Sequence, residues 1–167
     1  MSKITINNIN IVVIDEEGVG RSKIGQAMIK SYFPNMTIVG AGVREPDSKR
    51  TDMHPDVVKL IQQRCLIDIS QDIVVLLKPD MKTKNTIALV LNDQEHLPEY
   101  VTEQAFDVFI APVEDPGNDI ENKLEIAADC INEFVSMLIH FLTYRFNEIG
   151  TQRMVNGNVI PRLLQPN

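Results

Sequence analysis

The sequence lacks tryptophan, and aromatic residues of all kinds make up only 5% of its 167 positions. Cysteine and histidine are also scarce, with two and three copies. Cys65 and Cys130 lie far apart, and neither stands at Cys-x-x-Cys or zinc-ligand spacing from a cysteine or histidine. We therefore expect two buried thiols in a reducing compartment, with no metal and no cofactor.

Basic residues are outnumbered, with 16 Lys and Arg against 23 Asp and Glu and a net charge of −7. An acidic surface repels nucleic-acid phosphates and anionic lipids, so neither nucleic acid nor a membrane is expected as a partner. The N-terminus lacks a basic segment followed by an apolar run, and no apolar stretch reaches about 18 residues. We expect a cytoplasmic protein without a transmembrane helix.

Short apolar runs, which predict buried parallel strands, alternate along the chain with segments of helical spacing. One helix is predicted to begin near Pro55 with Asp52 as its cap, and a long final helix should run from Asn118 or Asp119 to about Phe146. This alternation predicts a three-layer α/β/α domain with a four- to five-stranded, mostly parallel sheet. We place the domain at residues 1–150 and a polar tail at 151–167. The predicted strands are 9–14, 37–41, 73–77, 87–91 and 106–110.

The loop that follows the first strand is the candidate site, because doubly wound sheets bind ligands at the carboxyl ends of their strands. A glycine-containing loop that leads into a helix can present several N–H groups to an anion. The candidate binding residues are Asp15, Glu16, Glu17, Gly18, Gly20, Arg21 and Ser22.

This loop resembles the phosphate loop of low-molecular-weight tyrosine phosphatases and the related thioredoxin-coupled arsenate reductases, which read Val-Cys-x5-Arg-Ser. Arg21-Ser22 matches the Arg-Ser half, and six positions earlier Asp15 stands where the family has its nucleophilic cysteine. The stretch 54–58, with the turn 67–70, resembles the family's His-Pro helix and Ile-Asp-Ile-Ser turn. The stretch 113–117 resembles its late Asp-Pro loop, which makes Asp115 the counterpart of the residue that protonates the leaving group.

The resemblance covers about residues 9–142 and implies a sheet of flavodoxin-like strand order. It also implies that the chain is inactive, because covalent phosphoryl or arsenate chemistry needs a thiolate nucleophile. Glu16 and Glu17 add negative charge beside Asp15, and Arg21 alone cannot offset three carboxylates. We therefore expect no catalytic residues, and a phosphatase-like domain that acts as a binding, regulatory or assembly protein.

Two other interpretations remain open from the sequence. Response-regulator receivers also begin with an apolar strand that ends in adjacent acids, and their phosphoacceptor aspartate ends the third strand, near which this chain has Asp80. Alternatively, Asp15, Glu16 and Asp115 could hold a divalent cation for metal-assisted hydrolysis. A simpler arrangement pairs Arg21 with one or two of these acids and locks the loop.

The second half of the final helix is apolar on nearly all sides, which predicts a covering partner, either a second copy of the chain or another protein. The alternative is that the chain's own tail covers this helix. The expected interface residues are Phe134, Leu138, Phe141 and Leu142.

Overall fold

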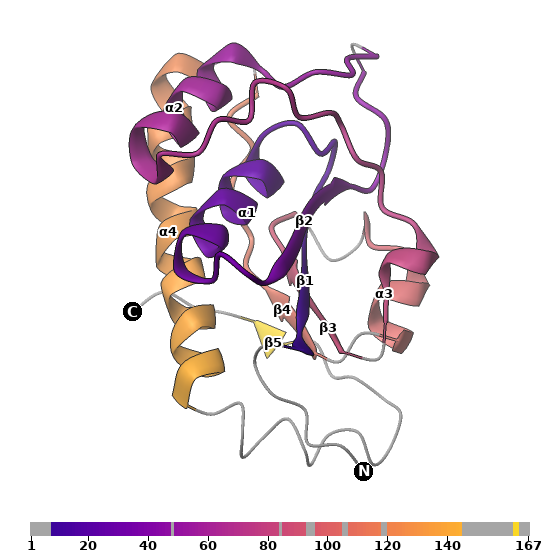
Figure 1. Cartoon of the computed structure of the whole chain (residues 1–167). Helices are drawn as coiled ribbons and strands as arrows, with labels where there is room; N and C mark the ends of the chain where they lie inside the picture. Colours follow the sequence, from indigo (N-terminus) through magenta and orange to yellow (C-terminus); the bar gives the residue numbers. More distant parts are fainter. Residues whose placement is uncertain are drawn as a thin grey trace.

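A computed structural model describes residues 8–47, 49–83, 85–92, 96–104, 107–117, 120–144 and 162–163. Its strands form one parallel sheet in the order β2-β1-β3-β4-β5 (Figure 1). This order confirms the predicted α/β class and the flavodoxin-like arrangement. The strands are β1 (Asn10–Asp15), β2 (Thr37–Gly42), β3 (Thr86–Val90), β4 (Asp107–Ile110) and β5 (Arg162–Leu163).

Helices cover both faces of the sheet unequally. Helices α1 (Arg21–Tyr32), α2 (Pro55–Cys65) and α4 (Ile120–Tyr144) lie on one face, and the short α3 (Glu99–Gln104) lies on the other (Figure 1). Successive residues of β1 point to opposite faces, so Ile11 and Val13 pack in the larger core and Val12 and Ile14 in the smaller. The apolar run of β1 therefore makes it a central strand buried on both sides.

The middle position of β1 decides where the chain can bind a ligand. Strand β2 lies on one side of β1 and β3 on the other, so the chain order reverses beside the carboxyl end of β1. This is the topological switch point, where open α/β sheets leave a crevice. The loop from Asp15 to Gly20 begins at this point and leads directly into α1.

Helix α2 begins at Pro55 as predicted, but its N-terminal cap is His54 and not Asp52. The Nδ1 atom of His54 accepts the Asp56 N–H at 3.2 Å. Asp52 stands too early for this role and instead forms an isolated antiparallel bridge with Ile73. Proline at the first helical position moves the cap to the residue immediately before it.

The strand predicted at 73–77 does not form. Ile73 is 68% exposed, and Leu76 makes only a single parallel bridge to Gly42. The segment is held from both sides, because the Val74 N–H donates to the Thr51 carbonyl at 2.9 Å and the Leu77 N–H donates to the Gly42 carbonyl at 2.8 Å. It therefore crosses the end of β2 without running along it. An apolar run alone does not distinguish a strand from a segment that only crosses a strand end, because a strand also needs a hydrogen-bonded partner along its length.

The expected interface on α4 is buried within the chain itself. Phe134, Leu138, Phe141 and Leu142 are 3%, 0%, 9% and 2% exposed. Phe141 packs edge-on against Phe109 of β4, with ring centroids 5.0 Å apart. The prediction that these four side chains form an intermolecular surface was wrong, because α1 and the sheet already cover them.

Two features of the C-terminal half bear on what the sequence predicted. By length and composition, Asn122–Thr143 would suit a membrane-crossing helix, with mean hydropathy 1.3, although we expected no such segment. This is weak evidence, since core helices meet the same test and 44% of this window is buried.

Arg162 and Leu163, which the sequence analysis placed in a separate polar tail, pair with Phe109 and Ile110 as β5. The expected cap at Asn118 or Asp119, Phe106 and the helix end at Phe146 lie outside the described residues.

Candidate functional site

The loop after β1 is shaped by a tight approach between two backbones. Gly18 has φ +74°, and a Cβ at this position would lie 2.8 Å from the Gly42 nitrogen and 2.9 Å from the Val75 oxygen. Only glycine fits this conformation and this space. Gly20 then caps α1 without a side-chain hydrogen bond, so the first turn of α1 faces the loop with its N–H groups.

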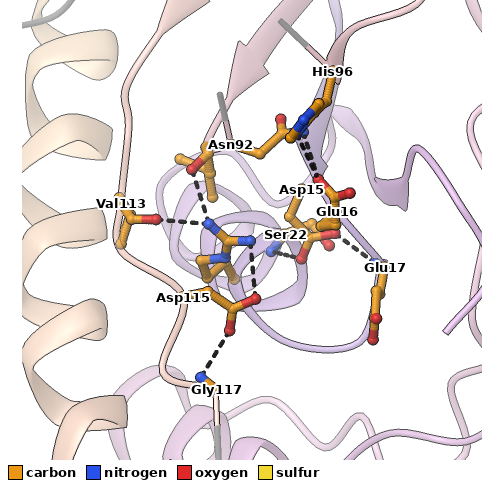
Figure 2. A network of polar contacts seen from close by, with 12 residues as sticks. Asp15, Glu16, Glu17, Ser22, Asn92, His96, Val113, Asp115 and Gly117 are labelled. Atoms are coloured by element: carbon orange, nitrogen blue, oxygen red, sulfur yellow. Dashed lines mark hydrogen bonds and ion pairs between the residues drawn. The ribbon is translucent and has the colours of Figure 1, made fainter. Parts of the chain in front are cut away.

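The Asp15 carboxylate fills the centre of this loop (Figure 2). Its Oδ1 accepts the Gly18 N–H at 2.5 Å, and its Oδ2 accepts the Ser22 N–H at 2.8 Å. The residue is 3% exposed. Burial raises the pKa of Asp15 above its ordinary value, and the hydrogen bonds from Ser22 and Gly18 oppose this rise. The N–H groups that a helix N-terminus would offer to an external anion are thus bound to a carboxylate of the chain itself.

Arg21 is directed to the ends of two neighbouring strands. Its Nη1 donates to the Val113 carbonyl at 2.6 Å and the Leu91 carbonyl at 3.2 Å, and its Nη2 lies 3.5 Å from Asp115 Oδ2. The residue is only 8% exposed. Arg21 therefore pairs with Asp115, one of the expected acids, and not with Glu16 or Glu17. It ties the first loop to the segments after β3 and β4.

Glu16 and Glu17 both pair with Arg44, a residue that sequence reasoning missed. The Arg44 guanidinium lies 3.0 Å from Glu16 Oε1, 2.8 Å from Glu17 Oε1 and 2.7 Å from Asp47 Oδ1. Burial alone would raise the pKa of Glu16, but the hydrogen bond from Arg44, with help from Asn92 and His96, holds that pKa below its ordinary value. Arg44 follows β2 by two positions, and this proximity to the same edge of the sheet was the available signal.

Asn92 and His96 also converge on Glu16 (Figure 2). Asn92 Nδ2 lies 3.4 Å and His96 Nδ1 lies 3.6 Å from Glu16 Oε2. Asn92 follows β3 by two positions and is 4% exposed, whereas the His96 side chain is 59% exposed. Sequence reasoning missed both residues as members of the site, because nothing in the local sequence indicates that the ends of β1 and β3 are adjacent.

Asp115 stands at the rim of the same site, as the resemblance implied. Its Oδ2 faces Arg21, and its Oδ1 accepts the Gly117 N–H at 2.9 Å (Figure 2). Its side chain is 64% exposed. The structure thus brings the second loop to the first, although 100 positions of sequence separate Asp15 from Asp115.

Two hollows open above this edge of the sheet. The first, of ≈ 440 Å³, lies over the first loop and extends to His54, Arg50 and the Asp-Pro segment. The second, of ≈ 450 Å³, lies over the ends of β1 and β3. The residues that line both are Glu16, Arg21, Arg44 and Asp115.

The acidic residues do not form a shared cation site in the described part of the chain. No group of three or more His, Cys, Asp or Glu side chains is placed to hold a metal there. Asp15 faces backbone N–H groups, Glu16 faces Arg44, and Asp115 faces Arg21. The metal-dependent interpretation therefore finds no support in this arrangement.

The positions expected for a receiver differ as well. Asp80 is exposed in a single 3-10 turn, Pro79–Met81, after the segment that failed to become a strand. The observed third strand, β3, is followed by Leu91 and Asn92, so no aspartate stands directly at its carboxyl end.

No protein-family model and no curated protein matches the sequence. Solved structures do match. A low-molecular-weight protein tyrosine phosphatase from T. tengcongensis has TM-score 0.60 at 14% identity, over 79% of this chain and 98% of that one. An arsenate reductase from Archaeoglobus fulgidus has TM-score 0.61 at 15% identity, over 78% and 99%. Wzb of Vibrio vulnificus, in complex with benzylphosphonate, has TM-score 0.64 at 17% identity, over 79% and 97%. The chain thus shares the fold of these phosphatases and reductases.

Proposed function

We propose that this chain is a catalytically silent protein with the phosphatase and arsenate-reductase fold, which acts by binding in a regulatory or assembly role. The observation that carries this proposal is the Asp15 carboxylate, which accepts hydrogen bonds from Gly18 and Ser22 at the centre of the first loop. The neighbour from Vibrio vulnificus is described with a phosphonate ligand. In this chain an internal carboxylate takes the loop N–H groups that a phosphate-like anion would need.

The chemistry at this position also argues against turnover. Phosphoryl transfer through a covalent intermediate needs a strong nucleophile that is also a good leaving group, which a thiolate is and a carboxylate in this setting is not. Both Asp15 oxygens already accept hydrogen bonds, which lowers their nucleophilicity further. A phosphate dianion that entered the loop would be repelled by the negative charge of this buried carboxylate.

Arg21 supports the same conclusion. An arginine at the start of α1, beside the loop N–H groups, could offer a bidentate fork to an anion. Here its Nη1 donates to two main-chain carbonyls, and its Nη2 faces Asp115. Recruiting it to a phosphate would cost these interactions, because buried carbonyls left without donors are destabilising. The arginine therefore holds the loops together.

The direct test is turnover of p-nitrophenyl phosphate and of arsenate by the purified full chain. We expect no rate above buffer, beside an active tyrosine phosphatase of this fold as the positive control. Activity that survives further purification and disappears in Arg21→Ala would refute the proposal, because contaminating activity would not depend on this residue.

A further inference from the structure

A recess lies where the C-terminal turns of α1 and α2 meet the middle of α4, and Figure 1 shows these three helices side by side. It measures ≈ 440 Å³. Its wall is partly apolar, since Met28 is 5% exposed and Cys65 packs against the larger core. None of its residues lines the hollows above Asp15, so it is separate from the candidate site. The lining residues are Met28, Ser31, Tyr32, Arg64, Cys65 and Asn132.

Leu66 stands directly beside this recess, because it follows Cys65 in the chain. It caps the C-terminus of α2 with φ +56° and ψ +32°, and its N–H donates to the Gln62 carbonyl at 3.2 Å. This is the left-handed region, where a Cβ is unfavourable and glycine is the usual residue. Leu66 is also 82% exposed, the largest value among the exposed large apolar residues that the structure describes.

The conformation and the exposure of Leu66 together point to a contact outside the chain. An exposed leucine alone is ordinary, and so is a left-handed residue at a helix end. Leucine at this position, however, combines an unfavourable backbone with a side chain that the chain itself does not bury. Strained residues of this kind persist where further contacts hold them, often at binding surfaces. Tyr32, which lines the recess and is 56% exposed, adds a second uncovered apolar side chain.

The shape of this patch favours a second copy of the chain as the occupant. An exposed leucine and a recess large enough for a leucine side chain lie next to each other on one surface. Rotation about a two-fold axis between them places the leucine of each copy at the recess of the other, which is the self-complementary geometry of a closed dimer. A different partner would need to supply both a protruding side chain and a recess in the same arrangement.

The charges around the recess are compatible with this symmetry. Arg64 lies at its wall and contacts Glu125 and, at 2.8 Å, Asp129, whose side chains are 59% and 72% exposed. Under the same rotation the acids of one copy approach Arg64 of the other, so charges of opposite sign are brought together. The chain as a whole carries −7 and repels its copy at long range, which makes a patch of mixed charge a favourable place for a contact.

We propose that the full chain forms a two-fold dimer through this patch, with Leu66 of each copy seated in the recess of the other. The sequence led us to expect a second copy or another protein on α4, at apolar residues that the fold buries, and the patch at Leu66 is a different surface. The inference goes beyond the proposed function. Neither depends on the other, because the patch and the site around Asp15 share no residue.

The test is the mass of the purified full chain, measured by sedimentation equilibrium and light scattering from low to high micromolar concentration under reducing conditions. We expect the mass to rise with concentration from that of one chain to that of two. Leu66→Gly, which removes the side chain and suits the left-handed backbone, should raise the dissociation constant of the dimer at least about tenfold. Ile73→Ala, at a 68% exposed residue that does not line the recess, should leave it unchanged. A wild type that stays monomeric, or an unchanged dissociation constant in Leu66→Gly, would overturn the proposal.

Filling the recess tests the other half of the contact. Asn132→Trp places a large side chain at its wall and should abolish the dimer while Leu66 is still present. Thr143→Trp, at an exposed position about three turns further along α4, is the matched control and should dimerise like the wild type. Circular dichroism at low concentration shows whether each variant is folded, and Leu66→Gly decides the question if Asn132→Trp does not fold. A dimer that persists in folded Asn132→Trp lies on another surface and refutes this one.

Discussion

Asp15 shows how one residue can close a site while preserving the loop that forms it. The Gly18 and Ser22 N–H groups keep an anionic acceptor, and it is supplied from inside the chain. Because the carboxylate is buried, its charged form is penalised, and its pKa is raised. The two N–H donors oppose this effect and keep the loop complementary to negative charge.

Removing this carboxylate should make the loop available to an external anion. In Asp15→Ala the two N–H groups lose their partner, and sulfate can replace it. We expect sulfate at a tenfold excess over Kd to raise the free energy of unfolding of this variant by about 1.4 kcal/mol, which appears as a higher Tm. The Tm of the wild type should stay nearly unchanged. Asp80→Ala, which removes an exposed acid, is the control for net charge. The same sulfate response in all three proteins would show that the loop is not the binding site.

Lys82 is a second residue whose environment opposes its charge. Its Nζ has no hydrogen-bond partner among the described residues and lies 5.7 Å from the centre of the Tyr100 ring. Burial lowers the pKa of Lys82 to about 8, against a weaker attraction from Glu103. In an unfolded chain the pKa of a lysine is about 10.4.

The Lys82→Met variant should therefore be more stable than wild type at neutral pH. Between about pH 8 and ~10.4 the unfolded wild-type chain holds more protons than the folded chain, so wild-type stability rises with pH. Below pH 8 the variant should exceed the wild type in free energy of unfolding by about 1 kcal/mol, after allowing for partial solvent exposure. This difference corresponds to about 2–4 °C in Tm and should shrink by pH 10. Lys78→Met, at an exposed neighbour, is the matched control. A gain that stays constant with pH would assign the effect to packing and not to charge.

At the scale of elements, α4 shows why apolar residues on nearly all sides of a helix do not by themselves indicate an interface. Its residues on one face pack against α1 and the sheet, and Leu138 is fully buried. On the far side, Ile126 is 68% exposed on the same helix. Contacts of Arg64 with Glu125 and with Asp129, the latter at 2.8 Å, join α2 to this helix. A helix that contacts both another helix and a sheet needs apolar residues over a wide arc.

Leu138→Ala should lower the free energy of unfolding by about 2–5 kcal/mol, because it leaves a cavity in the core. Ile126→Ala, on the same helix at an exposed position, should change it by less than about 0.5 kcal/mol. Urea unfolding followed by circular dichroism measures both. If Leu138→Ala instead left stability intact and reduced the mass in light scattering, the interface first expected from the sequence would be correct.

At the scale of the whole molecule, the two faces of the sheet differ in depth. Three helices cover the larger core, and the other face is covered by the six-residue α3 and the extended segment with Val75 and Leu77. This arrangement leaves the carboxyl edge open, and the three loops that carry Asp15, Arg44 and Asp115 meet there. Ion pairs among these loops couple segments distant in sequence, so the site depends on the complete fold.

The sequence by itself determined the class of the fold, the switch-point loop and the helix that begins at Pro55. These features follow from local patterns, since apolar runs, helical spacing, glycine and proline act through neighbouring residues. The position of Asp15 at the end of a buried strand was readable in the same way. The resemblance then placed Asp115 opposite that loop.

The tertiary structure alone decided how the site's charges are paired and which apolar residues are buried. Arg44 pairs with Glu16 and Glu17, and Asn92 turns to Glu16, because parallel strands bring the ends of β1, β2 and β3 together. The segment 73–77 and the apolar side of α4 look alike in sequence, yet the first is part-exposed and the second is core. Hydrophobicity drives burial, but which surfaces meet depends on contacts between residues far apart in the chain.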